Sequence, residues 1–157
     1  MPLTSYTIER TFTVAPERLF RAFVDPEDLK VWVWGAGARG VEADLDVRPG
    51  GRLCVTTEVE GPDGKTNRFG WRGVVLEVDP GRRLVHTLHW DAPVGYNEPG
   101  MNPVDEAILA EFLPDEQGCR LRYTHLGIPD DGQSAAEHER SVRVTFDDLE
   151  THLAASR

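Results

Sequence analysis

The sequence has no run of about 18 or more apolar residues, the length that a membrane-spanning helix requires. It has only two cysteines, Cys54 and Cys119, and their spacing is not that of a metal or redox site. Its first residues lack the basic and apolar regions of a signal peptide. We therefore expect a cytoplasmic protein with two reduced thiols and no membrane insertion.

Basic residues are also scarce, with 17 Lys and Arg against 27 Asp and Glu and a formal net charge of −10. Binding to phosphate groups depends on clustered Lys and Arg side chains. The charge balance thus argues against nucleic acids and anionic membrane surfaces as partners. No linker, internal repeat or low-complexity tract interrupts the chain, so we expect one domain over residues 1–157.

The pattern of apolar residues predicts an α+β fold. Alternation predicts a strand over 6–14, and closely spaced turn signals predict about six antiparallel strands between 41 and 127. Pro16 begins a short helix, and a longer helix is predicted over 134–154. One curved sheet needs its apolar face covered, and the last helix is the only element large enough to cover it. Segment 91–102 is long for a hairpin loop and predicts a lid or rim.

Residues 31–40 read "VWVWGAGARG" and match the dinucleotide-binding pattern G-x-G-x-x-G at Gly35, Gly37 and Gly40. That function requires a strand before the glycines and a helix after them. Asp25 and Pro26 instead predict the start of a helix that ends near residue 34. The residues after Gly40 alternate as in a strand. We therefore interpret the glycines as the exit from a short helix, at the mouth of a cavity.

The stretch "RPGGR" over 48–52 is typical of a type II turn, with Pro49 and Gly50 at its two central positions. An anion-binding role for the flanking arginines is the alternative. Arg52, just inside the following strand, could point into a pocket mouth. Arg10 shares a face with apolar residues of the first strand, so we expect it to be buried and paired or to lie near a wet cavity.

Several segments resemble the helix-grip superfamily, which includes START, Bet v 1 and polyketide cyclase-like domains. Within it, the chain is most similar to bacterial proteins named after the activator of Hsp90 ATPase. The resemblance rests on four stretches that span nearly the whole chain: "RTFTVAPERLFRAFVDPEDLKVW", "RPGGR", "DGKTNRFGWRGVVLEVDPGRRLVHT" and "TFDDLETHL". It implies a curved antiparallel sheet around a long C-terminal helix, with two short helices after the first strand. The fold hosts many functions, so the resemblance does not name a ligand.

The histidines do not predict a metal site within any one element. His86 and His89 face opposite sides of one strand. His138 and His152 lie on one helical face about 21 Å apart, by the rise of an α-helix. A site built across elements remains open, but we expect neither a metal nor a cofactor. His138 lies on the gripped face of the last helix, and His125 shares one face of its strand with Leu121 and Tyr123, although which face is inward stays open. One of these two histidines is a candidate to orient a ligand or to act as an acid–base group.

Three hypotheses for function follow. The first is binding of an apolar or aromatic small molecule, such as a lipid, polyketide or aromatic compound, between the sheet and the last helix. The expected ligand-binding residues are Trp34, Trp71, Trp90, Phe112, Tyr123, His138, Phe146 and Arg52. The second is an enzyme of cyclase, dehydratase or hydrolase type on the same fold, with no catalytic residue assigned. The third is a partner of an Hsp90-type chaperone. A homodimer is compatible with each.

Overall fold

The computed structural model describes residues 2–35, 38–61, 63–91 and 106–156. Seven strands form one antiparallel sheet in the order β1-β7-β6-β5-β4-β3-β2. In chain order the strands are β1 (Leu3–Phe12), β2 (Arg39–Leu45), β3 (Arg52–Glu60), β4 (Thr66–Asp79), β5 (Arg83–Asp91), β6 (Glu106–Asp115) and β7 (Gly118–Pro129). The helices are α1 (Pro16–Val24), α2 (Pro26–Trp32) and α3 (Ser134–Ala155).

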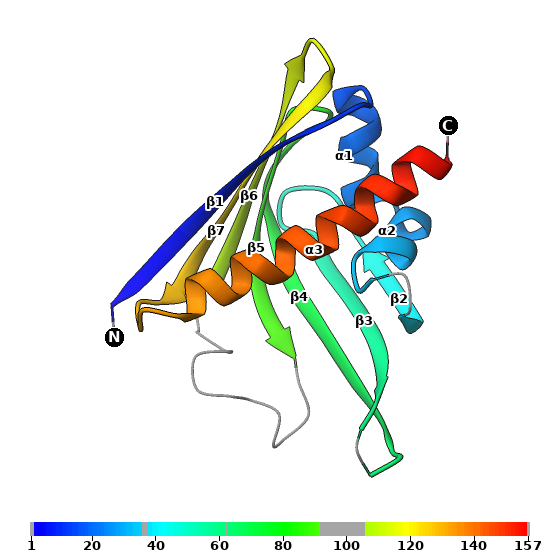
Figure 1. Cartoon of the computed structure of the whole chain (residues 1–157), viewed down its shortest axis with the longest axis vertical. Helices are drawn as coiled ribbons and strands as arrows, with labels where there is room; N and C mark the ends of the chain where they lie inside the picture. The colour runs from blue at the N-terminus through cyan, green and yellow to red at the C-terminus, as the bar shows by residue number, and fades with distance from the viewer. Residues whose placement is uncertain (1, 36–37, 62, 92–105, 157) are drawn as a thin grey trace.

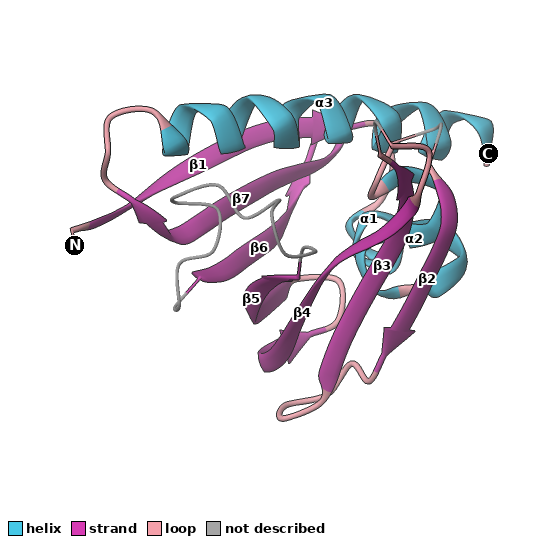
Figure 2. Ribbon diagram, turned by 90° about the horizontal axis from the view of Figure 1, so that it is seen from below, coloured by secondary structure: helices cyan, strands magenta, loops and turns pink. Residues whose placement is uncertain are grey.

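Helix α3 lies across one face of the curved sheet, and α1 and α2 lie near its C-terminal half (Figures 1 and 2). It packs against β1, β7 and α2. We call the face of the sheet that α3 covers the inner face and the opposite one the outer face. This architecture confirms the predicted helix-grip fold.

Local sequence explains where α2 begins and ends. The Asp25 side chain accepts a hydrogen bond of 2.9 Å from the backbone N–H of Glu27, and Pro26 occupies the first helical position. The helix ends at Trp32, and Gly35 follows with a φ of +90°, in the left-handed region that favours glycine. The stretch 31–34 is therefore a helix end, as predicted.

No dinucleotide-binding arrangement follows these glycines in the described part of the chain. Strand β2 includes Gly40, so the helix that would hold a pyrophosphate is absent there. Gly37, one of the glycines expected at the cavity mouth, lies outside the described residues. The lid predicted over 91–102 also lies outside them, except for Asp91, which ends β5.

The "RPGGR" turn is a type II turn, as predicted. The Gly51 N–H donates a hydrogen bond of 2.8 Å to the Arg48 carbonyl, and Gly50 has a φ of +83°.

Both cysteines are free thiols; Cys119 is buried and Cys54 is half-buried.

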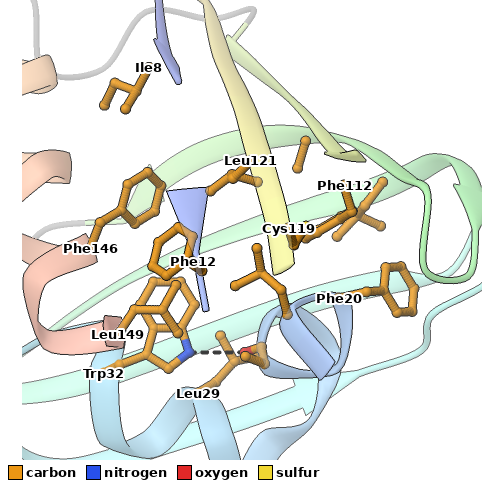
Figure 3. Close-up of a cluster of buried hydrophobic side chains, with 14 of the residues drawn as sticks. Ile8, Phe12, Phe20, Leu29, Trp32, Phe112, Cys119, Leu121, Phe146 and Leu149 are labelled. Atoms are coloured by element: carbon orange, nitrogen blue, oxygen red, sulfur yellow. Dashed lines mark hydrogen bonds between the residues drawn. The ribbon is translucent and has the colours of Figure 1, made fainter. Parts of the chain in front are cut away.

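An aromatic and aliphatic core fills the space between the sheet, α1, α2 and the C-terminal half of α3. Figure 3 shows Phe146 and Leu149 of α3 directed toward Phe12 of β1 and Trp32 of α2. The Trp32 indole N–H donates a hydrogen bond of 2.9 Å to the carbonyl of Ala22, so this tryptophan ties α2 to α1. Trp32 is thus a core residue and leaves no unpaired polar group.

Candidate functional site

A row of residues crosses four neighbouring strands on the inner face. Tyr6 of β1 pairs with His125 of β7, His125 with Ile108 of β6, and Ile108 with His86 of β5. Directly opposed residues in a sheet share a face. All four are buried, with exposed fractions between 2% and 8%. The sheet register therefore places two histidines and a tyrosine beneath α3.

Two further residues complete a cluster around His125. The Nε2 atom of His125 lies 2.9 Å from the carboxylate of Glu106, the first residue of β6, and both side chains are at most 4% exposed. The Tyr6 hydroxyl lies 3.1 Å from Nδ1 of the same ring. His138 of α3 meets His125 edge to face, with ring centroids 5.4 Å apart. We call Glu106, His125 and His138 the His–Glu cluster.

Burial controls the protonation of the groups beside this cluster. It lowers the pKa of His86 to about 4; the hydrogen bond with the Thr87 carbonyl opposes this shift, and the electrostatic interaction with His125 adds to it. The pKa of His138 is also lowered, chiefly by burial and then by His125. Burial raises the pKa of Tyr6 and of Tyr123, and the negative charge of Glu106 adds to both shifts. At neutral pH these two imidazoles and two phenols are therefore uncharged.

Two tryptophans of the inner face, Trp71 and Trp90, lie next to a third, Trp34, from the turn after α2; we call Trp34, Trp71 and Trp90 the indole group. Trp71 and Trp90 are cross-strand partners on β4 and β5, and the Trp34 ring lies 5.2 Å from that of Trp90. Trp71 stacks on His86 with ring centroids 5.6 Å apart and an interplanar angle of 18°. His86 therefore lies beside the indole group, and Ile108 separates it from His125 in the row.

The indole N–H groups of Trp34 and Trp90 are buried and have no hydrogen-bond partner among the described residues. A buried donor without a partner costs about 1–3 kcal/mol. Trp34 also lines an open groove of about 420 Å³, together with Gly35 and residues of the outer side of α3. These α3 residues are Glu137, Arg140, Ser141, Val144, Thr145 and Asp148. One tryptophan thus contacts both the groove and the inner face.

The other predicted aromatic contacts are divided between the core and the site. Phe112 packs against Phe20 and Phe23 of α1, at centroid distances of 5.5 and 5.3 Å, and is 1% exposed. Phe146 is equally buried and packs on Tyr123 at 5.2 Å. Tyr123 lies on the same face of β7 as His125, two residues before it. The structure therefore places His138 within the His–Glu cluster and Tyr123 next to it on the inner face. Phe112 lies beneath α1, and Phe146 packs in the core beneath α3.

The two predicted arginine contacts lie elsewhere. Arg52 is exposed on the outer face, because the next residue of β3, Leu53, points into the core. It lines a shallow hollow of about 110 Å³ there, which excludes it from the inner-face site. Arg10 pairs with Asp147 and Glu150 of α3, each at 2.7 Å. The expectation of a paired arginine is confirmed, and its partners hold α3 against β1.

The histidine pairs within single elements behave as predicted. His86 is on the inner face, whereas His89 lies on the outer face, 3.6 Å from Asp91. His152, far along α3 from His138, bonds to Asp28 at 2.6 Å. Sequence reasoning considers His125 as an alternative to His138 but does not assign Glu106 or Tyr6 to the site. The shared parity of Tyr123 and His125 was the available signal, but it did not reveal which face is inward.

The fold and the inner-face site define a helix-grip protein, and comparisons with known proteins agree. The family model described as "Activator of Hsp90 ATPase homolog 1-like protein" matches residues 13–154. The chain belongs to this family. No curated protein matches the sequence. Membership supports a ligand-binding or related role in general, without specifying a ligand.

Solved structures show the same fold. An uncharacterised protein from Rhizobium leguminosarum is similar at 18% identity and a TM-score of 0.75, over 98% of this chain and 96% of that one. A protein from Rhizobium loti is 24% identical with a TM-score of 0.74, over 96% and 97% of the two chains. A Staphylococcus aureus protein of unknown function is 18% identical with a TM-score of 0.72, over 99% and 96%.

Within the described residues, no helix has the length and apolar character needed to cross a bilayer.

Proposed function

We propose that this protein binds a small aromatic or apolar molecule that carries a hydrogen-bond acceptor. The molecule would lie between the sheet and α3, with its apolar part against the indole group. The proposal treats residues 1–157 as one cytoplasmic domain. Lipid-like, polyketide-like and aromatic compounds all have the required combination of an apolar body and an acceptor oxygen.

The observation that carries the proposal is the pair of indole N–H groups of Trp34 and Trp90, which have no hydrogen-bond partner in the part of the chain that the structure describes. Their rings are in contact, so the two donors belong to one apolar surface. A ligand carbonyl or hydroxyl oxygen that accepts from either donor would remove the cost of leaving it unpaired. Apolar walls with a few directed polar groups are characteristic of small-molecule sites.

Access and orientation have separate structural support. The groove beside Trp34 is open and adjoins the indole that contacts Trp90, so a small movement of Trp34 would connect groove and inner face. The neutral phenol of Tyr123 and the neutral imidazole of His138 could then orient the polar end of the ligand. Arg52 takes no part, since it lies on the outer face.

A thermal-shift screen with fatty acids, aromatic carboxylates and polycyclic aromatic polyketides tests the proposal. We expect at least one class to raise the melting temperature, because a ligand that binds only the folded state stabilises it. The same compounds should change the fluorescence of the tryptophans that they contact. No stabilisation by any class would contradict the proposal.

Variants then locate the site. Trp90→Phe should weaken the affinity for the best ligand by about tenfold or more, because it removes an indole donor and part of the apolar surface. Arg52→Ala is the matched control on the outer face and should bind as the unchanged protein does. Equal affinities in both variants would place the ligand elsewhere.

The buried contact between His125 and Glu106 favours a second function, catalysis of cyclase, dehydratase or hydrolase type. A histidine oriented by a carboxylate is a common general base. The other nitrogen of this ring lies 3.1 Å from the Tyr6 hydroxyl, so a substrate group would have to take the place of that hydroxyl to give up its proton. The perturbed pKa values of His86 and His138 are also typical of reactive sites. Loss of turnover in Glu106→Gln with unchanged ligand affinity would favour the enzyme; unchanged turnover would exclude this role for the pair.

The chaperone-partner hypothesis has less support. A protein-binding surface usually includes a contiguous exposed apolar patch. Among the described residues, the large exposed apolar side chains come from several different helices and strands: Leu3, Val31, Val59, Val74, Leu76, Leu126 and Val144.

A further inference from the structure

The His–Glu cluster joins three potential metal ligands from three separate elements. Glu106 comes from β6, His125 from β7 and His138 from α3. One carboxylate oxygen and one nitrogen of each imidazole all lie within 4.8 Å of one another. We propose that these three side chains bind a divalent first-row transition cation, with zinc as the representative ion.

The donor set selects this class of cation. Two imidazole nitrogens and one carboxylate oxygen suit zinc and its neighbours, whereas magnesium and calcium prefer sets made of oxygen. Three protein ligands also leave at least one coordination position for water or for an oxygen of a bound molecule. That arrangement is typical of a reactive metal centre, since structural zinc sites are usually closed by four protein ligands.

The spacing of Glu106 and His125 is close to that of two ligands on one ion. Their O···N distance is 2.9 Å, and adjacent ligands of a tetrahedral ion with bonds of about 2.1 Å lie about 3.4 Å apart, so a separation of about half an ångström admits the ion. His138 is half-buried, and no hydrogen bond to its ring is found among the described residues. A change of its side-chain rotamer can therefore close the site without breaking a hydrogen bond, although it alters the edge-to-face contact with His125.

Tyr6 supplies the outer support that metal-binding histidines usually have. Its hydroxyl lies 3.1 Å from Nδ1 of His125, on the opposite side of the ring from Glu106. A hydroxyl can donate to or accept from an imidazole nitrogen. When Nε2 binds a cation, the Nδ1–H of His125 can donate to this oxygen and keep the ring oriented.

The burial of the Glu106 carboxylate favours the binding of a cation. The Glu106 side chain is 2% exposed, and among the described side chains its one basic neighbour within 4.0 Å is His125. A carboxylate buried with so little water gains strongly from a divalent charge. Metal binding can be measured without any organic molecule, so its failure would leave the proposed ligand binding untouched.

Titration of the chelator-treated full chain with zinc chloride at pH 7.5, followed by calorimetry, tests the site. We expect one zinc ion per chain. Cobalt(II), used as a spectroscopic substitute, should give visible absorption bands typical of nitrogen and oxygen coordination. No zinc binding would overturn the proposal.

Three variants separate this site from adventitious binding. His138→Ala should lower zinc affinity by about 100-fold or more, because losing a direct ligand should cost at least as much as losing an outer partner. Glu106→Gln should also weaken binding while keeping a side chain of similar size. His89→Ala, on the outer face, is the control and should bind zinc normally. Binding that survives both His138→Ala and Glu106→Gln would overturn the proposal.

Discussion

The Nε2 atom of His125 and the carboxylate of Glu106 form a hydrogen bond of 2.9 Å that is almost completely shielded from water. The two residues belong to neighbouring strands, and Tyr6 bonds the remaining ring nitrogen of His125 at 3.1 Å. Each polar group in this arrangement therefore depends on another for its hydrogen bond. Removing one member leaves a buried partner unsatisfied.

Glu106→Ala should lower the free energy of unfolding by about 3 kcal/mol, because it leaves His125 buried without its acceptor. Glu106→Gln should cost less, since the amide oxygen can still accept from His125. Urea unfolding of the metal-free protein measures both values. An alanine variant as stable as the glutamine variant would show that the pair contributes little to folding.

Asp28 joins the short helices to α3 and is the second site where a single change should be costly. Its carboxylate bonds two guanidinium nitrogens of Arg18 at 3.0 and 2.9 Å and Nε2 of His152 at 2.6 Å. Burial opposes ionisation, but the bonds from Arg18 and His152 prevail and lower the pKa of Asp28. Asp28→Ala should therefore lower the unfolding free energy by about 3 kcal/mol.

The neighbouring carboxylate of Glu27 provides the control for Asp28. Its side chain is 82% exposed and pairs with Lys30 at 2.9 Å. Exposed ion pairs contribute about 0–1 kcal/mol, so Glu27→Ala should change the unfolding free energy by less than about 1 kcal/mol. Similar losses in the two variants, measured by urea unfolding, would contradict the role given to Asp28.

His86 should make folding stability depend on pH. Its pKa falls from 6.5 to about 4 on folding, so between these values the unfolded chain binds the proton more readily. Its contribution to stability is therefore complete above pH 6.5 and is lost as the pH falls toward 4. Comparing unfolding free energies at pH 7.5 and 4.5, the unchanged protein should lose about 2–3 kcal/mol more than His86→Gln. Equal losses would show that His86 titrates normally in the folded protein.

The sequence predicted the order of elements because its local signals agree with the fold. The Asp25-Pro26 cap, the Pro49-Gly50 turn and the spacing of apolar residues in α3 each specify a conformation within a few residues. These signals also separated the glycines near residue 35 from a nucleotide-binding loop.

The site was only partly predictable, because it depends on contacts between distant segments. Alternation showed that Tyr123 and His125 share a face, but both faces of β7 carry apolar residues. Glu106 and His138 meet His125 only after β6 and α3 take their places. The sequence also did not show which way Arg52 points. Successive side chains of a strand point to opposite faces, so a shift of one residue decides whether Arg52 lies on the inner or the outer face.

Phe146 offers a direct test of which predicted ligand contacts belong to the core. It is 1% exposed and contacts Phe12, Trp32 and Tyr123, besides Phe23. Phe146→Ala should lower the unfolding free energy by about 3–5 kcal/mol, because the closely packed rings around it cannot fill the cavity that it leaves.

Val144 lies on the same helix, is 59% exposed and lines the outer groove, so Val144→Ala is the matched control. It should change stability by less than about 0.5 kcal/mol. If Phe146→Ala proved as mild as this control, the space beneath α3 would have to be loosely packed. Phe146 would then act as a wall of the ligand site, as the sequence predicted, instead of as a residue of the core.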